Sequence, residues 1–190
     1  MLRHVQEYEK YVEVTGFKEV SFEDAEELLK AIRREKHQTV SIQFFDAELV
    51  ATWEHLYFAV LNALVAFRNR RKISKNLSME VMLYASAQRQ IRKAVELIGV
   101  KRGSSNVAVT IVGEDPDVVK TAFSAVSEHL SKKPDESVLE LSTTKLPKIR
   151  GAFGISETEI ETIKEKDKDY VERVVVDLVI ERMALLSTQL

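Results

Sequence analysis

The chain has 190 residues, of which 45% are hydrophobic and 31% are charged, and its net charge of −2 is close to neutral. This composition is typical of a soluble globular protein and excludes fibrous and disordered classes, while the lack of cysteine excludes disulfide bonds and thiolate zinc sites. The longest apolar block, 56–67, is too short to span a bilayer, and MLRHVQEYEK at the start lacks the apolar core of a signal peptide, so we expect a cytoplasmic protein without a membrane partner.

The first predicted elements are two strands that flank a helix. Residues 11–15 read as a short strand, and Ser21 can cap a helix whose apolar residues recur at helical spacing as far as Ile32. Apolar and polar residues alternate over 40–44, which indicates a half-buried strand.

A long helix is expected next. Asp46 can cap it, and it extends to about Arg68 with apolar side chains nearly all round, so it should be the central buried helix. The following apolar run, 79–85, can be capped by Ser78. It fits a buried strand or a helix equally well, because periodicity cannot separate the two in a short apolar run.

Ser86 can cap a further helix that ends at Gly99. Its inward residues are expected to be Ile91, Ala94, Val95 and Ile98. Residues 106–112 predict a strand, and the pair Asp115-Pro116 has the N-cap and N1 residues in the order in which helices begin.

The C-terminal third predicts one more strand and two helices. The strand is expected over 138–141, Ser156 and Glu159 fit a capping box, and the last helix is expected over 167–187. The whole pattern predicts one mixed α/β (α+β) domain over residues 1–190, with about six or seven helices packed around a small sheet of roughly four strands.

No motif typical of catalysis or cofactor binding occurs in the chain. Glycine-rich phosphate loops and GxSxG are absent, and the four histidines are scattered without metal-ligand spacing. His55 fits a hydrogen-bonded core histidine better than a ligand. We therefore expect no enzyme, no cofactor and no metal. An unrecognised small enzyme is a remaining alternative, because active sites assemble in space.

The last predicted helix has a wider apolar arc than an ordinary surface helix needs. Either the domain buries this helix on two sides, or a partner covers one side of it. For the second interpretation the candidate partner-binding residues are Val176, Val179, Ile180, Met183 and Leu186.

Positive charge is concentrated in one segment. Residues 1–67 carry a net charge of −5, residues 68–102 a net charge of +8 from ten basic and two acidic side chains, and residues 103–190 a net charge of −5. Clustered arginine and lysine suit a phosphate backbone, although a solvated face balanced by acidic flanks would have the same pattern. The candidate RNA-binding residues are Arg71, Lys72, Lys75, Ser86, Arg89, Gln90, Lys93, Lys101 and Arg102.

A spaced set of residues in this basic segment resembles a known family. The set is Ser78, Glu80, Val81, Met82, Leu83, Tyr84, Ala85, Ser86, Arg89, Gln90 and Ile91, followed by Ala94, Gly99, Val100 and Lys101. It is similar to the kinase-binding accessory subunit of the KEOPS (EKC) complex, the PRPK-binding-protein family. Ala87 is a departure, because the family often has glycine or proline there.

The resemblance implies a non-catalytic subunit that binds the kinase-like ATPase of the complex, which in turn binds the threonylcarbamoyl transferase subunit. The assembly makes threonylcarbamoyl-adenosine in tRNA, and archaeal members are similar in also binding tRNA, notably at its 3′ CCA end. The last helix would then face the kinase, and the basic segment would meet tRNA. A pure protein-interaction subunit, with its basic segment against an acidic partner, is the alternative.

Overall fold

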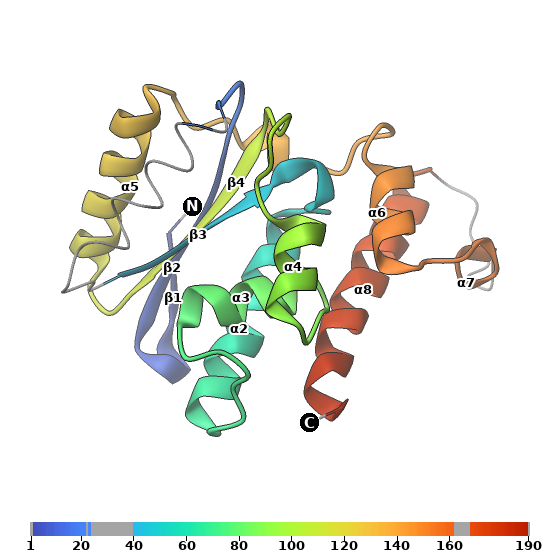
Figure 1. Cartoon of the computed structure of the whole chain (residues 1–190), viewed down its shortest axis with the longest axis horizontal. Coiled ribbons are helices and arrows are strands. Elements are labelled where there is room, and N and C mark those ends of the chain that lie inside the picture. The colour runs from blue at the N-terminus through green and yellow to red at the C-terminus, as the bar shows by residue number, and fades with distance from the viewer. Residues whose placement is uncertain (1, 22, 24–39, 162–167, 190) are drawn as a thin grey trace.

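Four strands form one antiparallel sheet in the order β1-β2-β4-β3 (Figure 1). The computed structural model describes residues 2–21, 23, 40–161 and 168–189. Within these residues the strands are β1 (Arg3–Val5), β2 (Lys10–Phe17), β3 (Val40–Asp46) and β4 (Val107–Gly113). Three of the predicted strands are confirmed, and β1 is an addition that the sequence pattern did not predict.

Seven α-helices lie within the described residues. They are α2 (Trp53–Arg68), α3 (Leu77–Ala85), α4 (Ile91–Ile98), α5 (Pro116–Leu130), α6 (Leu146–Phe153), α7 (Glu157–Glu161) and α8 (Lys168–Leu186). The helices and the sheet confirm the predicted mixed α/β class, while the extent of the domain over 1–190 stays a prediction. The helix predicted after Ser21 lies outside the described residues.

Helices cover both faces of the sheet (Figure 1). Because successive strand residues point to opposite faces, β4 supplies Val107, Val109 and Ile111 to one face and Ala108 and Val112 to the other. Helix α5 packs on the first face, α2 and α3 pack on the second, and α8 packs on α2 and α3. The apolar surface buried in these two layers is the main source of stability.

A third apolar cluster joins α6 to α8. Ile149 and Phe153 of α6 pack against Val175 and Val179 of α8. Helix α8 is therefore covered from two sides, by α6 and by the helices on the sheet.

The predicted capping box is present at the start of α7. The backbone N–H of Glu159 donates to Ser156 Oγ at 3.2 Å, and the carboxylate of Glu159 accepts the backbone N–H of Ser156 at 2.9 Å. The same carboxylate pairs with Arg182 of α8. These hydrogen bonds, that from the Ser156 backbone first, lower the pKa of Glu159 to about 2 and tie α7 to α8.

Asp46 starts a short 3-10 helix, η2 (Ala47–Leu49), instead of the long helix. Its carboxylate accepts the backbone N–H of Glu48 at 3.0 Å. Val50 then returns to an extended conformation, with φ −97° and ψ 118°, and α2 begins only at Trp53. The predicted start of the long helix was therefore wrong, because the aspartate caps a single turn.

Ser86 ends α3 instead of starting α4. Its hydroxyl donates to the Leu83 carbonyl at 3.0 Å, and the backbone N–H of Gln88 donates to the same carbonyl at 3.0 Å. Between them Ala87 has a left-handed conformation with φ 51°. This is a Schellman C-cap, and α4 starts only at Ile91. The apolar run before Ser86 is thus a helix, which decides between the two alternatives.

Only two of the four apolar residues expected to point inward from α4 are buried. Ala94 and Ile98 are fully buried, whereas Ile91 and Val95 are 47% and 42% exposed. The helix packs on α3 through Ala94 and Ile98. Ile91 and Val95 lie beside that contact and face solvent.

The strand predicted over 138–141 is wrong. Its first residues belong to a 3-10 helix, η3 (Glu136–Leu139), whose N-cap residue Asp135 accepts a backbone N–H of the first turn at 3.0 Å. The backbone N–H of Asp135 donates to the Gly16 carbonyl of β2 at 2.8 Å and holds η3 across that strand. A Cβ on Gly16 would lie 1.9 Å from Val138, so the close approach requires glycine.

Candidate interaction surfaces

His55 is a structural residue in the core. It is fully buried, its Nδ1 accepts the backbone N–H of Ala51 at 3.1 Å, and its Nε2 donates to the Ala85 carbonyl at 2.7 Å. Burial lowers the pKa of His55 to about 4, so the imidazole stays neutral. The ring ties the start of α2 to the end of α3, which confirms the interpretation of a hydrogen-bonded core histidine.

Neither a metal cluster nor a membrane span is found in the described part of the chain. No group of three or more His, Asp or Glu side chains there could hold a metal ion. No described helix combines the length and the apolar character needed to cross a membrane. The two features that stand out on the described surface are a stretch of cations and an apolar groove.

The loop between α2 and α3 carries the densest group of cations. Its four basic residues are all exposed: Arg70, Arg71, Lys72 and Lys75. The loop leaves α2 in a defined way, because Arg70 is left-handed with φ 56° and the N–H of Arg71 donates to the Ala66 carbonyl at 2.9 Å. The ammonium of Lys72 lies 4.2 Å from the centre of the Phe67 ring, a cation–π contact.

Helix α4 and the turn after it add further cations. Lys93 is exposed on α4, where Arg92 also forms an ion pair with Glu96 at 2.7 Å. Lys101 and Arg102 are exposed in the turn that leads to β4. The positive charge of the sequence segment is therefore on the surface at both ends of α4.

Ser104 fixes the turn that bears Lys101 and Arg102. Its hydroxyl donates to the Asp46 carboxylate at 2.7 Å and accepts the backbone N–H of Lys101 at 3.1 Å. Its own N–H donates to the Lys101 carbonyl at 2.9 Å. Because Asp46 also caps η2, the turn is attached to the end of β3.

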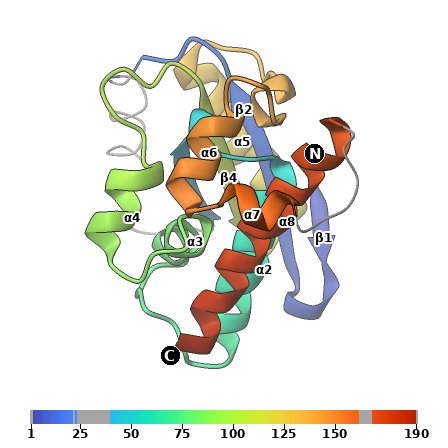
Figure 2. The same cartoon turned by 90° about the vertical axis from the view of Figure 1, so that its right-hand side faces the viewer.

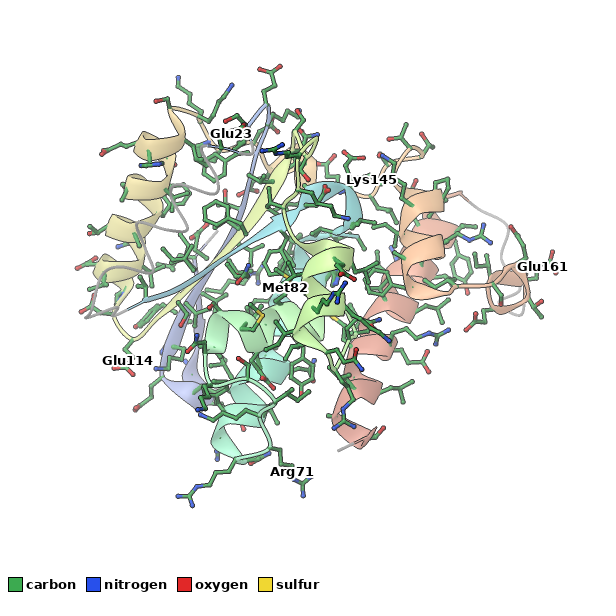
Figure 3. All side chains as sticks on the ribbon, viewed as in Figure 1. Glu23, Arg71, Met82, Glu114, Lys145 and Glu161 are labelled. Atoms are coloured by element: carbon green, nitrogen blue, oxygen red, sulfur yellow. The ribbon has the colours of Figure 1, made fainter. Side chains whose placement is uncertain are left out.

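The cations form an elongated band and not a compact pocket. In Figure 1 the α2–α3 loop lies below α4 and the α4–β4 loop lies above it, and Arg71 projects from the lower end of the molecule in Figure 3. We call this set the basic band. Its members are Arg70, Arg71, Lys72, Lys75, Arg89, Arg92, Lys93, Lys101 and Arg102.

Eight of the nine predicted RNA-binding residues are exposed, including Arg89 and Gln90 at the entry to α4. The exception is Ser86, which is 1% exposed and whose hydroxyl is bonded to the backbone of α3. Its place in the predicted set needs correction, because Ser86 shapes the turn into α4 and presents no atom to a ligand on the surface.

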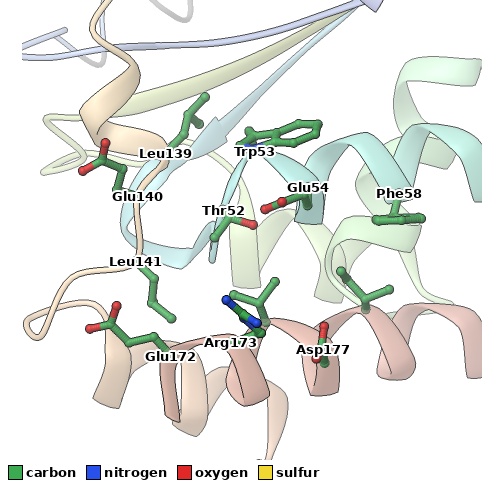
Figure 4. Close-up of a pocket in the computed structure, with 12 residues that line it drawn as sticks. Thr52, Trp53, Glu54, Phe58, Leu139, Glu140, Leu141, Glu172, Arg173 and Asp177 are labelled. Atoms are coloured by element: carbon green, nitrogen blue, oxygen red, sulfur yellow. The ribbon is translucent and has the colours of Figure 1, made fainter. Parts of the chain in front are cut away.

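A groove of about 830 Å³ lies between α2 and α8 (Figure 4). Its apolar lining comes from three separate segments: Trp53, Phe58, Leu139, Leu141, Val176 and Ile180. Its polar lining consists of Thr52, Glu54, Glu140, Glu172, Arg173 and Asp177. Four carboxylates face one guanidinium, so the rim of this α2–α8 groove is negative.

Aromatic side chains stand at the α2 side of the groove. Phe58 is 39% exposed, so a large part of its ring is open to solvent. The ring of Trp53 lies under the Arg3 guanidinium of β1, at 4.0 Å from the ring centre. Aromatic and arginine side chains of this kind are enriched among the residues that dominate binding energy in protein interfaces.

The five residues predicted as partner-binding on α8 divide between the groove and the core. Val176 and Ile180 line the α2–α8 groove. Val179, Met183 and Leu186 are buried against the rest of the chain, so they hold α8 in place and offer no free surface. Burial on two sides accounts for most of the wide apolar arc of this helix.

Lys145 holds the segment that closes one end of the groove. Its buried ammonium donates to the Val138 carbonyl at 2.8 Å and to the Glu140 carbonyl at 3.2 Å. Burial lowers the pKa of Lys145 to about 8, against the opposing effect of nearby carboxylates, first that of Glu48. The groove residues Leu139 and Glu140 thus depend on a buried lysine for their position.

The sequence matches a family model described as kinase binding protein CGI-121 over residues 17–187. The chain belongs to the CGI-121 family. It is 34% identical over 116 residues to the regulatory protein Cgi121 of Methanocaldococcus jannaschii, which covers 61% of this chain and 72% of that protein. It is 23% identical over 130 residues to the EKC/KEOPS complex subunit CGI121 of Coccidioides immitis, which covers 66% of this chain and 62% of that protein.

The residues matched by the CGI-121 family include the whole basic band and the lining of the α2–α8 groove. Strand β1 and most of β2 precede the matched residues. Arg3, which covers Trp53, is therefore outside the part that defines the CGI-121 family.

Sequence reasoning missed most of the groove. Trp53 and Phe58 on α2, and Leu139 and Leu141 before α6, are absent from the predicted binding residues. The one local signal is the cluster of aromatic residues at the start of α2, Trp53, Tyr57 and Phe58. That signal does not reveal a groove, because η3 and α8 complete it from far along the chain.

Proposed function

We propose that this protein is a non-catalytic, cytoplasmic subunit of a KEOPS/EKC complex. In this proposal it binds the kinase-like ATPase of the complex, which links it to the threonylcarbamoyl transferase subunit, and it helps to recruit tRNA for the formation of threonylcarbamoyl-adenosine. The observation that carries the proposal is the match to a kinase-binding family over residues 17–187, together with a relative named as an EKC/KEOPS subunit.

The α2–α8 groove is the surface that best suits a folded protein partner. Protein interfaces combine apolar and aromatic side chains with polar groups, and the groove lining contains both kinds, with Phe58 and Ile180 among carboxylates. The negative rim favours a partner whose contact surface carries lysine or arginine around an apolar anchor. We assign this groove to the kinase-like ATPase.

Phe58→Glu tests that assignment. The substitution replaces an exposed aromatic ring of the groove lining by a charge, so we expect affinity for the kinase-like ATPase to fall at least tenfold, or by about 1.4 kcal/mol, in isothermal titration calorimetry. Val65→Glu is the matched control, because Val65 is on the same helix, is also 39% exposed and does not line the groove. Equal effects of the two substitutions would contradict the assignment to the groove.

The basic band supports the proposed role in tRNA binding. Exposed arginine and lysine side chains along one elongated surface suit the regular negative charge of an RNA backbone. Few aromatic side chains lie among them, which favours an RNA end, such as the 3′ CCA end, over stacking on many bases.

Titration of tRNA across a salt series tests the RNA role. We expect fluorescence anisotropy to show tighter binding of intact tRNA than of tRNA without CCA, and a fall of log affinity with log salt of about 0.7 per contacted phosphate. If removal of CCA has no effect and binding is no stronger than to a random single-stranded RNA, the specific recruitment role fails. The alternative of a pure protein-interaction subunit would then be preferred.

A further inference from the structure

The two acidic residues of segment 68–102 have opposite environments. Glu96 is exposed on α4 and pairs with Arg92. Glu80, on the first turns of α3, is completely buried. Both are carboxylates in the most basic part of the chain. Comparing them can therefore separate the effect of a negative charge from the effect of a buried anchor.

The Glu80 carboxylate is bonded to the backbone of the α2–α3 loop. Its two oxygens accept the N–H of Ile73 at 3.0 Å and 3.1 Å, and one of them accepts the N–H of Ser74 at 2.6 Å. A buried carboxylate is tolerated when hydrogen bonds replace its hydration, and backbone N–H groups bond more strongly to a charged acceptor than to a neutral one. Glu80 therefore pulls the middle of the loop into the protein.

The anchored residues are flanked by the cations of the loop. Ser74 is 7% exposed, and its hydroxyl accepts the N–H of Asn76 at 3.2 Å, which tightens the turn further. Lys72 and Lys75 stand directly on either side of the Ile73–Ser74 pair and are exposed. With the centre of the loop held inside, the cationic side chains on both sides are directed outward at fixed places.

We propose that Glu80 is a positioning residue for phosphate binding: its buried carboxylate holds Ile73 and Ser74 so that the cations of the α2–α3 loop form a fixed end of the basic band. Without the anchor the loop would sample many conformations, and ordering it on binding would cost affinity. This inference rests on the proposed role of the basic band in tRNA binding.

A matched pair of substitutions tests the proposal. Glu80→Gln and Glu96→Gln each remove one negative charge from the same segment and keep the size of the side chain. Charge alone predicts that both raise affinity for tRNA. Positioning predicts opposite signs, because glutamine keeps only one acceptor oxygen, uncharged, and its NH2 group would lie against the N–H of Ile73, which the second carboxylate oxygen now accepts.

The readouts are tRNA affinity, its salt dependence and affinity for the kinase-like ATPase. We expect Glu80→Gln to weaken tRNA binding about tenfold and to make the salt slope shallower by about 0.7 for each phosphate that the loop no longer reaches. We expect Glu96→Gln to leave tRNA binding equal or tighter. Kinase affinity should be unchanged in both, which a general loss of structure would not allow. Glu80→Gln binding as tightly as Glu96→Gln overturns the proposal.

Two further measurements cover the case in which Glu80→Gln does not fold. Glu80→Asp keeps the charge and shortens the side chain, so it should also weaken tRNA binding, whereas charge alone predicts no change. In the wild-type protein, amide hydrogen exchange by NMR should be slower for Ile73 and Ser74 than for Lys72 and Lys75, whose N–H groups have no acceptor among the described residues. Equal exchange of the four amides overturns the proposal.

The outcomes also separate this inference from the proposed function. If the wild-type protein does not bind tRNA, the RNA role fails and the inference falls with it. If the wild-type protein binds tRNA with the expected salt dependence and Glu80→Gln binds equally well, the RNA role stands and only the positioning role is overturned.

Discussion

Lys145 lies buried where the chain passes from η3 into α6, with its ammonium between the Val138 and Glu140 carbonyls. A neutral lysine retains two N–H donors, so deprotonation does not remove either hydrogen bond. Burial penalises the charged form alone, which explains why the pKa of this lysine falls to about 8. The side chain therefore holds the two carbonyls at any pH, but the free-energy penalty of burying it is present only while the lysine is charged.

The pH dependence of stability should reveal this penalty. The folded-state pKa of about 8 is below the ordinary lysine value of 10.5, so between these values the unfolded state binds more protons and the free energy of unfolding rises with pH. The gain is lost again as pH falls through the folded-state pKa. Relative to Lys145→Met, which has no titratable group there, the wild type should gain about 2 kcal/mol between about pH 7.5 and 10. The measurement is urea unfolding of both proteins at the two pH values. The same difference in free energy of unfolding between wild type and Lys145→Met at both pH values would contradict this prediction.

At the scale of single elements, the ends of the helices decide how the chain turns. Helix α3 stops at Ser86 because Ala87 takes the left-handed conformation, and the N–H groups of Ala87 and Gln88 then satisfy the last carbonyls of the helix. An L-residue with a Cβ is strained at this position, whereas glycine is not. The turn that leads into α4 thus requires Ala87 to adopt a backbone conformation that alanine disfavours.

Ala87→Gly should therefore stabilise the protein. We expect a gain of about 0.5 to 1 kcal/mol in the free energy of unfolding, seen as a rise of about 2 °C in Tm. Ala85→Gly is the matched control, because Ala85 is in the last turn of the same helix and glycine there should destabilise by about 1 kcal/mol. If both substitutions lower Tm, the strain at residue 87 is not significant.

Elements with a strong local signal could be predicted from the sequence, and elements set by distant contacts could not. Helix α5 was predicted because Asp115 caps it locally, accepting the N–H of Asp117 at 2.7 Å. Strand β1 has only three residues and owes its conformation to pairing with β2, so it was missed. Helix α6 was missed because Pro147 and Gly151 are poor helix formers, although Pro147 is tolerated in the first turn.

At the scale of the whole molecule, the basic band and the α2–α8 groove share no residue. In Figure 2, α4 lies on one side of α8 and β1 lies on the other, while Arg3 of β1 covers Trp53 of the groove. The two surfaces are therefore separate on the described part of the molecule. The proposed role, in which one chain binds both a kinase-like ATPase and tRNA, would need two separate surfaces of this kind.

The two surfaces were not equally accessible to prediction. The basic band follows the charge of one continuous segment, so the sequence predicted where these cations gather. Ser86, which was among the predicted RNA-binding residues, is buried. The groove combines α2, the residues after η3 and α8, and its lining depends on their packing. The sequence also could not show whether the domain itself or a partner covers the wide apolar arc of α8. That question depends on α6, which packs on α8 and was not predicted.

Arg70, in the loop just after α2, has the left-handed conformation that glycine adopts most easily, with φ 56°. An arginine there is less stable than glycine by about 1 kcal/mol, but glycine would remove a cation from the basic band. Stability and charge therefore compete at this position. Arg70→Gly should therefore raise the free energy of unfolding and at the same time lower the positive charge of the basic band.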